Sequence, residues 1–92
     1  MRGPLLLLLF FTFFTQATAQ IATVRSQDDG RPLELATLIS ESPRAFAMTN
    51  ARGQADVAAF AGAEAIEVRL IGYEPRRLSY AELETQGFEV FL

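Results

Sequence analysis

Residues 64–71, EAIEVRLI, decide the fold of this chain. Apolar and charged side chains alternate here, with Ile66, Val68 and Leu70 on one side and Glu67 and Arg69 on the other. A period of two is typical of a β-strand that has one buried face and one face in water. The stretch therefore predicts a strand, and Gly72 interrupts it as a bulge or bend would.

Six further segments have the length of short strands, and turn residues separate them. These segments are 21–27, 35–40, 44–49, 54–60, 73–78 and 88–92. The sequences DDG at 28–30 and NARG at 50–53 favour turns, because Gly accepts a positive φ and Asp or Asn bonds to neighbouring backbone. Pro75 confines its segment to a sheet edge, since proline lacks an N–H. Short strands with turns about every 8–12 residues predict an all-β fold, a small Ig-like or prealbumin-like sandwich of about seven strands.

Two local patterns refine this prediction. Ser79 and Glu82 have the spacing of a capping box, which predicts one helical turn over residues 80–85. In the segment 44–49, Phe46 and Met48 share one face of the expected strand.

The first nineteen residues have the order of a secretory signal peptide. Met1 and Arg2 supply a positive end, residues 5–14 an apolar run, and residues 17–19, ATA, a small-residue exit. A membrane-spanning helix is the alternative, but about ten apolar residues cover only ~15 Å of a ~30 Å hydrocarbon core. We therefore expect cleavage between Ala19 and Gln20, export of residues 20–92 as one domain, and no membrane span in the mature chain.

The composition excludes several classes of function. The chain has no His, Cys, Lys or Trp, and its net charge is −3. Without His and Cys it cannot form a Ser-His-Asp triad, a Cys-His pair or the usual zinc site. Without Lys it lacks a Schiff-base residue, and its acidic balance argues against nucleic-acid binding. We expect no catalytic, cofactor-binding or metal-binding residues, and the stability of a small domain without disulfides must come from a compact sheet core or a neighbour.

Three short motifs follow one another along residues 20–92. They are Pro32-Leu33 with Ala36, then Thr49 with Gly53, then Gly72-Tyr73. In this order, after a strand and an Asp-Asp-Gly turn, they resemble the carboxypeptidase regulatory-like domain. The similarity is greatest to the version at the N-terminus of TonB-dependent outer-membrane receptors of Bacteroidetes-type bacteria.

The chain departs from the family pattern at three positions. Asn50, Ala55 and Val57 stand where the family has Asp, Phe and Leu. Asn50 keeps the turn chemistry. Ala55 removes a large core residue, and Phe46 or Phe60 has to fill the gap.

The resemblance implies a non-catalytic accessory module in the periplasm, associated with the outer membrane and involved in nutrient uptake. Its partners would be proteins, either the plug and barrel of a receptor or other periplasmic components, contacted through strand edges or loops. The alternative is a free periplasmic or secreted module that binds a carbohydrate or protein ligand, which an exposed aromatic platform would favour. Because 73 residues cannot form a membrane barrel, we expect either a stand-alone module or a truncated receptor, and the apolar end 88–92 favours truncation.

Acidic residues raise two further hypotheses. Asp28 and Asp29, with Glu34 or Asp56, are candidate ligands for Ca²⁺, but the spacing of a calcium loop is absent and a solvated turn is the favoured interpretation. A pair of carboxylates for glycoside hydrolysis could come from a second set of acids, which are Glu64, Glu67, Glu74, Glu82 and Glu84. Acids that alternate along a strand usually form its wet face, so we expect no catalysis from them.

Two more sites have a structural and a functional interpretation. Arg76 and Arg77 could hold an anion or an acidic partner, but we expect them to protect an edge strand from pairing with other chains. Tyr73, next to Gly72, is expected to cover the margin of the core, and a contact with a partner is the alternative.

Overall fold

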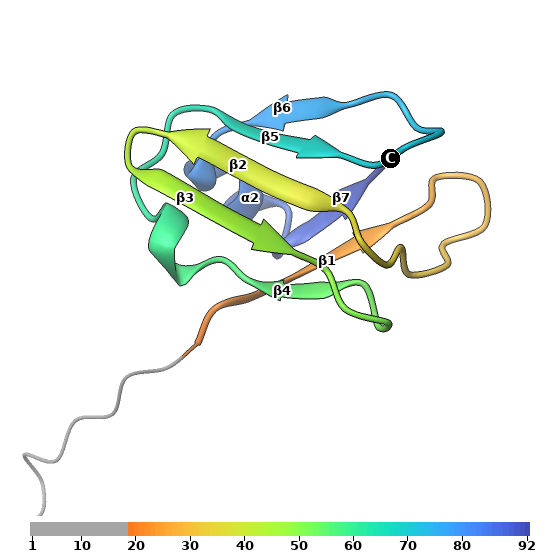
Figure 1. Cartoon of the computed structure of the whole chain (residues 1–92). Coiled ribbons are helices and arrows are strands. Elements are labelled where there is room, and N and C mark those ends of the chain that lie inside the picture. Colours follow the sequence, from red (N-terminus) through yellow and green to blue (C-terminus); the bar gives the residue numbers. More distant parts are fainter. Residues whose placement is uncertain (1–18) are drawn as a thin grey trace, which may run out of the picture.

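The computed structural model describes residues 19–92, which form two β-sheets packed face to face (Figure 1). The predicted signal peptide falls almost entirely on residues 1–18, which lie outside the described residues. The elements follow the chain in the order β1 (Ile21–Arg25), β2 (Thr37–Glu41), β3 (Arg44–Met48), β4 (Gln54–Asp56), η1 (Ala58–Phe60), β5 (Ile66–Arg69), β6 (Arg76–Leu78), α2 (Tyr80–Thr85) and β7 (Glu89–Phe91). The predicted all-β sandwich of about seven short strands is confirmed.

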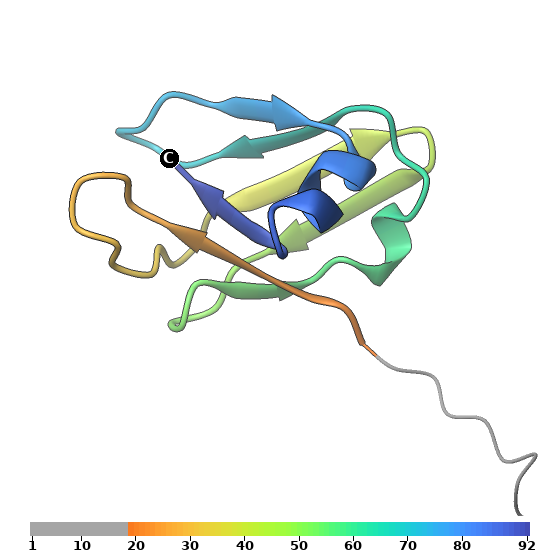
Figure 2. The same ribbon diagram turned by 180° about the vertical axis from the view of Figure 1, so that it is seen from behind.

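One sheet has four strands and the other has three. The four-stranded sheet has the order β3-β2-β5-β6, with antiparallel neighbours throughout. The three-stranded sheet has the order β4-β1-β7, in which β4 runs antiparallel and β7 parallel to β1. The four-stranded sheet is nearer the viewer in Figure 1, and the other sheet with α2 is nearer in Figure 2. None of the helices within residues 19–92 is long and apolar enough to cross a membrane.

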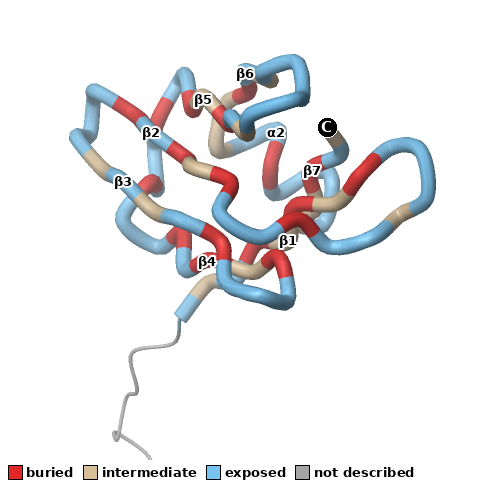
Figure 3. Tube along the Cα trace, turned by 45° about the vertical axis from the view of Figure 1, so that its right-hand side comes forward, coloured by how far each residue is buried: buried red, intermediate tan, exposed pale blue. Residues whose placement is uncertain are grey.

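The core lies between the two sheets and contains the alternating apolar residues of the strands. In β5, Ile66 and Val68 are fully buried while Glu67 and Arg69 face outwards, as the alternation predicts. Figure 3 shows the same change from buried to exposed residues along the strands. Phe60 is the largest fully buried side chain, whereas Phe46 is exposed. Of the two aromatic residues expected to compensate for Ala55, Phe60 is therefore the one in the core.

Several strands are shorter than the sequence predicts. The predicted strand 54–60 was wrong beyond Asp56, because the Asp56 carboxylate accepts the Ala58 N–H (3.0 Å) and a 3₁₀ turn follows. The predicted strand 35–40 begins only at Thr37, since Leu35 has a φ of 68°. Only Arg76–Leu78 of the segment 73–78 is a strand, after a turn in which the Tyr73 N–H donates to the Leu70 carbonyl (3.0 Å).

The predicted capping box is confirmed at the start of α2. The Ser79 hydroxyl accepts the Glu82 N–H (3.0 Å), and the Glu82 carboxylate accepts the Ser79 N–H (2.8 Å). Leu83 anchors the helix in the core. Tyr80 and Phe88 pack edge to face, with ring centroids 5.8 Å apart, and so connect the helix to the start of β7.

Candidate functional site

The residues of the first two motifs are hydrogen-bonded to one another. Thr49 is buried, and its hydroxyl accepts the Ala36 N–H (2.9 Å) and donates to the Leu33 carbonyl (2.6 Å). Its backbone also pairs with this loop, through the Ala36 carbonyl (2.9 Å) and the Leu35 N–H (3.0 Å). Thr49 thus holds the loop before β2 against the end of β3.

Gly53, the other residue of the second motif, packs closely against the Pro32-Leu33 loop. It has a φ of +72°, and a Cβ built there would lie 2.7 Å from the Val24 carbonyl oxygen and 2.9 Å from Cβ of Pro32. Only glycine permits this approach, because any larger side chain would push β1 and the Pro32 loop apart. The residues that carry these two motifs are therefore structural.

The third motif, Gly72-Tyr73, lies elsewhere, in the loop between β5 and β6. Tyr73 is exposed, and it lines a groove together with Leu35 and Ile39. Because Tyr73 is only 36% exposed, cover of the core margin and contact with a partner both stay predictions. The other tyrosine, Tyr80, packs against Phe88 as described above. Partial burial, and then the nearby carboxylates of Glu84 and Asp56, raise the pKa of the Tyr80 hydroxyl.

The candidate site is the solvent-facing side of the four-stranded sheet, here called the outer face. Residues that lie directly opposite one another on neighbouring strands share a face, and on the outer face they form two rows across the strands. The first row is Phe46, Ile39, Glu67 and Arg77, and the second row is Met48, Thr37 and Arg69. The face thus has an apolar half on β3 and β2, bordered by the pair Glu41 and Arg44, and a charged half on β5 and β6.

The apolar half of the outer face is solvent-exposed. Phe46 is 62% exposed, and Met48 and Ile39 are also exposed. A shallow hollow lies on either side of Ile39: one contains Phe46 and Arg44, and the other Leu35 and Tyr73. Ile71, which is 98% exposed, extends the second hollow. An exposed apolar surface that continues across several elements is a candidate contact site.

Leu35 is held in a strained conformation within this surface. Its φ of 68° is in the left-handed region, and its side chain is 59% exposed. An L-residue pays about 1–2 kcal/mol for this conformation, which glycine would not pay. Strain of this kind concentrates at binding sites. The exposed and strained Leu35 is therefore counted among the residues of this candidate contact surface.

Replacing Leu35 by Gly and by Ala measures this strain. We expect the free energy of unfolding of L35G to exceed that of L35A by about 1 kcal/mol, because only glycine adopts the left-handed conformation without strain. Urea unfolding followed by far-UV circular dichroism measures the difference. L35A of equal or greater stability would show that the backbone at residue 35 is unstrained.

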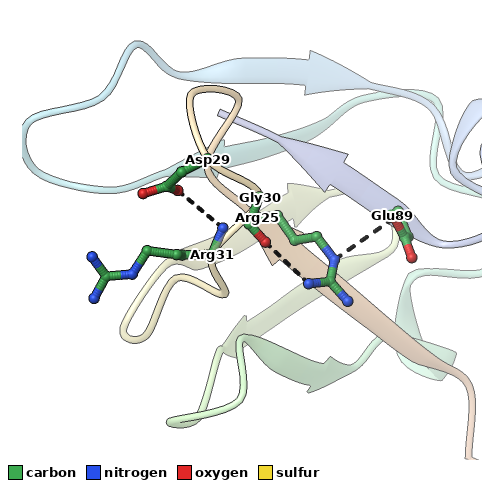
Figure 4. A network of polar contacts seen from close by, with 5 residues as sticks. All are labelled: Arg25, Asp29, Gly30, Arg31 and Glu89. Atoms are coloured by element: carbon green, nitrogen blue, oxygen red, sulfur yellow. Dashed lines mark hydrogen bonds and ion pairs between the residues drawn. The ribbon is translucent and has the colours of Figure 1, made fainter.

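Polar contacts on the other sheet order the loop between β1 and β2 (Figure 4). The Arg25 guanidinium donates to the Gly30 carbonyl (3.1 Å) and lies 3.8 Å from the Glu89 carboxylate. The Asp29 carboxylate accepts the Arg31 N–H (3.0 Å). These contacts hold the turn at residues 28–30.

The candidate calcium ligands are not brought together. Asp29 caps its own turn, Asp56 caps the 3₁₀ turn, and Glu34 lines the groove beside Leu35. Within residues 19–92, no group of three or more acidic side chains is placed to hold a metal ion.

The structure brings two of the five candidate catalytic acids together and leaves the other three apart. Glu64 and Glu67 line one open hollow of about 630 Å³ together with Arg77. Glu82 is engaged in the capping box, Glu74 is exposed in the loop between β5 and β6, and Glu84 is exposed on α2.

The two arginines of β6 have different positions. The predicted edge position of this strand is confirmed. Arg76 donates to the Phe91 carbonyl (2.9 Å), so its side chain bridges β6 to β7 of the other sheet. Arg77 is exposed opposite Glu67 on the outer face.

Sequence reasoning missed that Ile39, Met48 and Leu35 form an exposed apolar surface with Phe46. The strand 44–48, RAFAM, is apolar on both faces, and Ala45 and Ala47 are the residues that pack against the core. An apolar residue on both faces of a strand is the signal, because a two-layer sandwich can cover only one of them.

Known proteins do not place this chain in a family. Comparisons with protein-family models, with curated proteins and with solved structures found no match. The resemblance to the carboxypeptidase regulatory-like domain therefore stays an expectation, and the function has to follow from the surface of the domain.

Proposed function

We propose that this chain is an exported, non-enzymatic module that acts by contact with another protein through its outer face. The exposed apolar half of that face, with Phe46 at its centre, is the observation that carries the proposal. Burying such a surface against a partner is favourable at about 25 cal/mol per Å² of apolar area. The composition supports contact over chemistry, because His, Cys and Lys are absent from the sequence.

We further propose that the module is of the type found at the N-terminus of TonB-dependent outer-membrane receptors. The motif order supports this, together with a physical role for two of the motifs, since Thr49 and Gly53 secure the Pro32-Leu33 loop. The partner would then be a receptor plug or barrel or another periplasmic protein. A free exported module that binds a protein through the same face is the alternative.

Photo-cross-linking in cells that export the full chain tests this proposal. A photoreactive amino acid at Met48, on the outer face, is expected to form an adduct with an outer-membrane or periplasmic protein. The same group at Glu84, exposed on α2, is the control and is expected to form none. Adducts with a receptor would support the receptor module, and adducts with a soluble exported protein would support the free module.

The substitution Phe46→Thr is expected to abolish the Met48 adduct. Because Phe46 is mostly exposed and Thr suits a strand, the free energy of unfolding should change by less than about 1 kcal/mol. Circular dichroism in urea verifies the fold of the variant. Equal adduct yields from the wild type and the variant, or from Met48 and Glu84, would contradict the proposal.

A further inference from the structure

The outer face has a charge pattern that complements its own copy. Glu67 lies in the first row and Arg69 in the second, on the same strand and the same face. Their side chains are 4.0 Å apart and partly exposed. The two rows are two residues apart along the strands, or about 6.6 Å.

This pattern is self-complementary about a two-fold axis that lies in the plane of the contact. The axis is perpendicular to the strands and runs midway between the two rows. Such an axis places the first row of one copy over the second row of the other. Phe46 then lies over Met48 of the second copy and Ile39 over its Thr37, while Glu67 lies over its Arg69. Each of these pairs occurs twice, and Arg77, which has no counterpart in the second row, stays outside them.

We propose that the outer face binds a second copy of this chain, through a symmetric sheet-on-sheet contact. The inference rests on the first part of the proposed function, a protein contact through the outer face, and it names a second copy of this chain as the partner in place of a receptor. Aligned sheets pack face to face at about 10 Å with interdigitated side chains, which the exposed Phe46 and Met48 can supply.

The size of the face predicts weak association. Four strands about 4.8 Å apart and up to five residues long cover roughly 300 Å². Stable interfaces bury about 800 Å² per partner, so the contact belongs to the weak class. Leu35 and Ile71, exposed in loops beside the sheet, would add apolar area at the rim.

Charge exchange distinguishes a second copy from any other partner. Analytical ultracentrifugation of residues 20–92, from about 1 μM to about 1 mM, covers the range of weak association. We expect a monomer–dimer equilibrium in the wild type. E67R and R69E should each weaken it at least about tenfold, because like charges then meet twice in the interface. The double variant E67R/R69E should restore it, since each new arginine meets a new glutamate.

Matched control variants separate the effect of the local contact on dimerisation from the effect of net charge. E84R and R52E make the same charge changes at exposed positions away from the outer face, and they should leave the dimer unchanged. Circular dichroism verifies that every variant is folded. A monomeric wild type at about 1 mM, or a double variant as weak as the single ones, would overturn the inference.

Together with the photo-cross-linking test, the result distinguishes a failure of this inference from a failure of the proposed function. A monomer that still forms the Met48 adduct with another protein would refute self-association and leave the proposed function standing. A dimer whose only adduct at Met48 is with itself would support self-association and refute the receptor contact.

Discussion

Gly53→Ala is expected to lower the free energy of unfolding by about 4 kcal/mol, the largest effect of any substitution considered. Part of the loss, about 1–2 kcal/mol, comes from placing an L-residue at a φ of +72°. The remainder comes from overpacking, because the new methyl group would lie 2.7 Å from the Val24 carbonyl oxygen and 3.0 Å from the Leu33 nitrogen. These two atoms are hydrogen-bonded to each other, so neither is free to move.

A loss of this size approaches the total stability of a marginal domain, about 5 kcal/mol. We therefore expect G53A to be largely unfolded in mild urea, as measured by far-UV circular dichroism, which suits a chain without Trp. Gly30→Ala is the matched control. Gly30 has nearly the same φ, +76°, but nothing lies within 4 Å of its added Cβ, so its loss should be only about 1 kcal/mol. Equal losses in the two variants would show that the close approach at Gly53 does not matter.

Thr49→Val is expected to cost about 3 kcal/mol. Valine has almost the same shape, but it removes the hydroxyl that bonds to the Ala36 N–H and the Leu33 carbonyl. Both backbone groups belong to buried residues, and each buried group left without a partner costs about 1–3 kcal/mol. In the wild type, every buried side-chain nitrogen and oxygen of residues 19–92 has a partner.

Thr49→Ser separates the hydroxyl from the methyl group. Serine keeps both hydrogen bonds and loses one buried methyl group, so its cost should be about 1 kcal/mol. Hydrogen exchange gives a second readout, because the Ala36 amide should exchange much faster in T49V than in T49S. Similar stability and exchange in the two variants would contradict the clamp that we assign to the Thr49 hydroxyl.

Both substitutions bear on the meaning of the sequence motifs. Thr49, Gly53 and the Pro32-Leu33 loop are recognisable in the sequence because their roles depend on particular atoms: a hydroxyl, a missing Cβ and a fixed φ. A motif of this kind indicates how a chain folds, and it leaves open what the chain binds. The candidate site lies instead on the outer face, on residues that belong to none of the motifs except Tyr73.

The strands were predictable where one face is apolar and the other is charged. β5 is the clearest case, and the capping box before α2 is equally local. Their limits were less predictable, because tertiary contacts decide where extended backbone stops. Leu35 leaves the extended conformation where its N–H bonds to the Thr49 carbonyl, and Asp56 ends β4 by capping a 3₁₀ turn.

The sequence alone determined the strand alternation, the turns, the helix cap and the absence of the side chains that common catalysis needs, since all of these depend on neighbouring residues or on composition. Only the tertiary structure decided which side of β3 is buried. Ala45 and Ala47 face the core while Phe46 and Met48 face solvent. Apolar side chains lie on both sides of that strand, and the larger ones share their side with Arg44, so local hydrophobicity does not distinguish the two sides. The small side chains pack against the core, and the large ones are left on the surface that we propose as the site of contact.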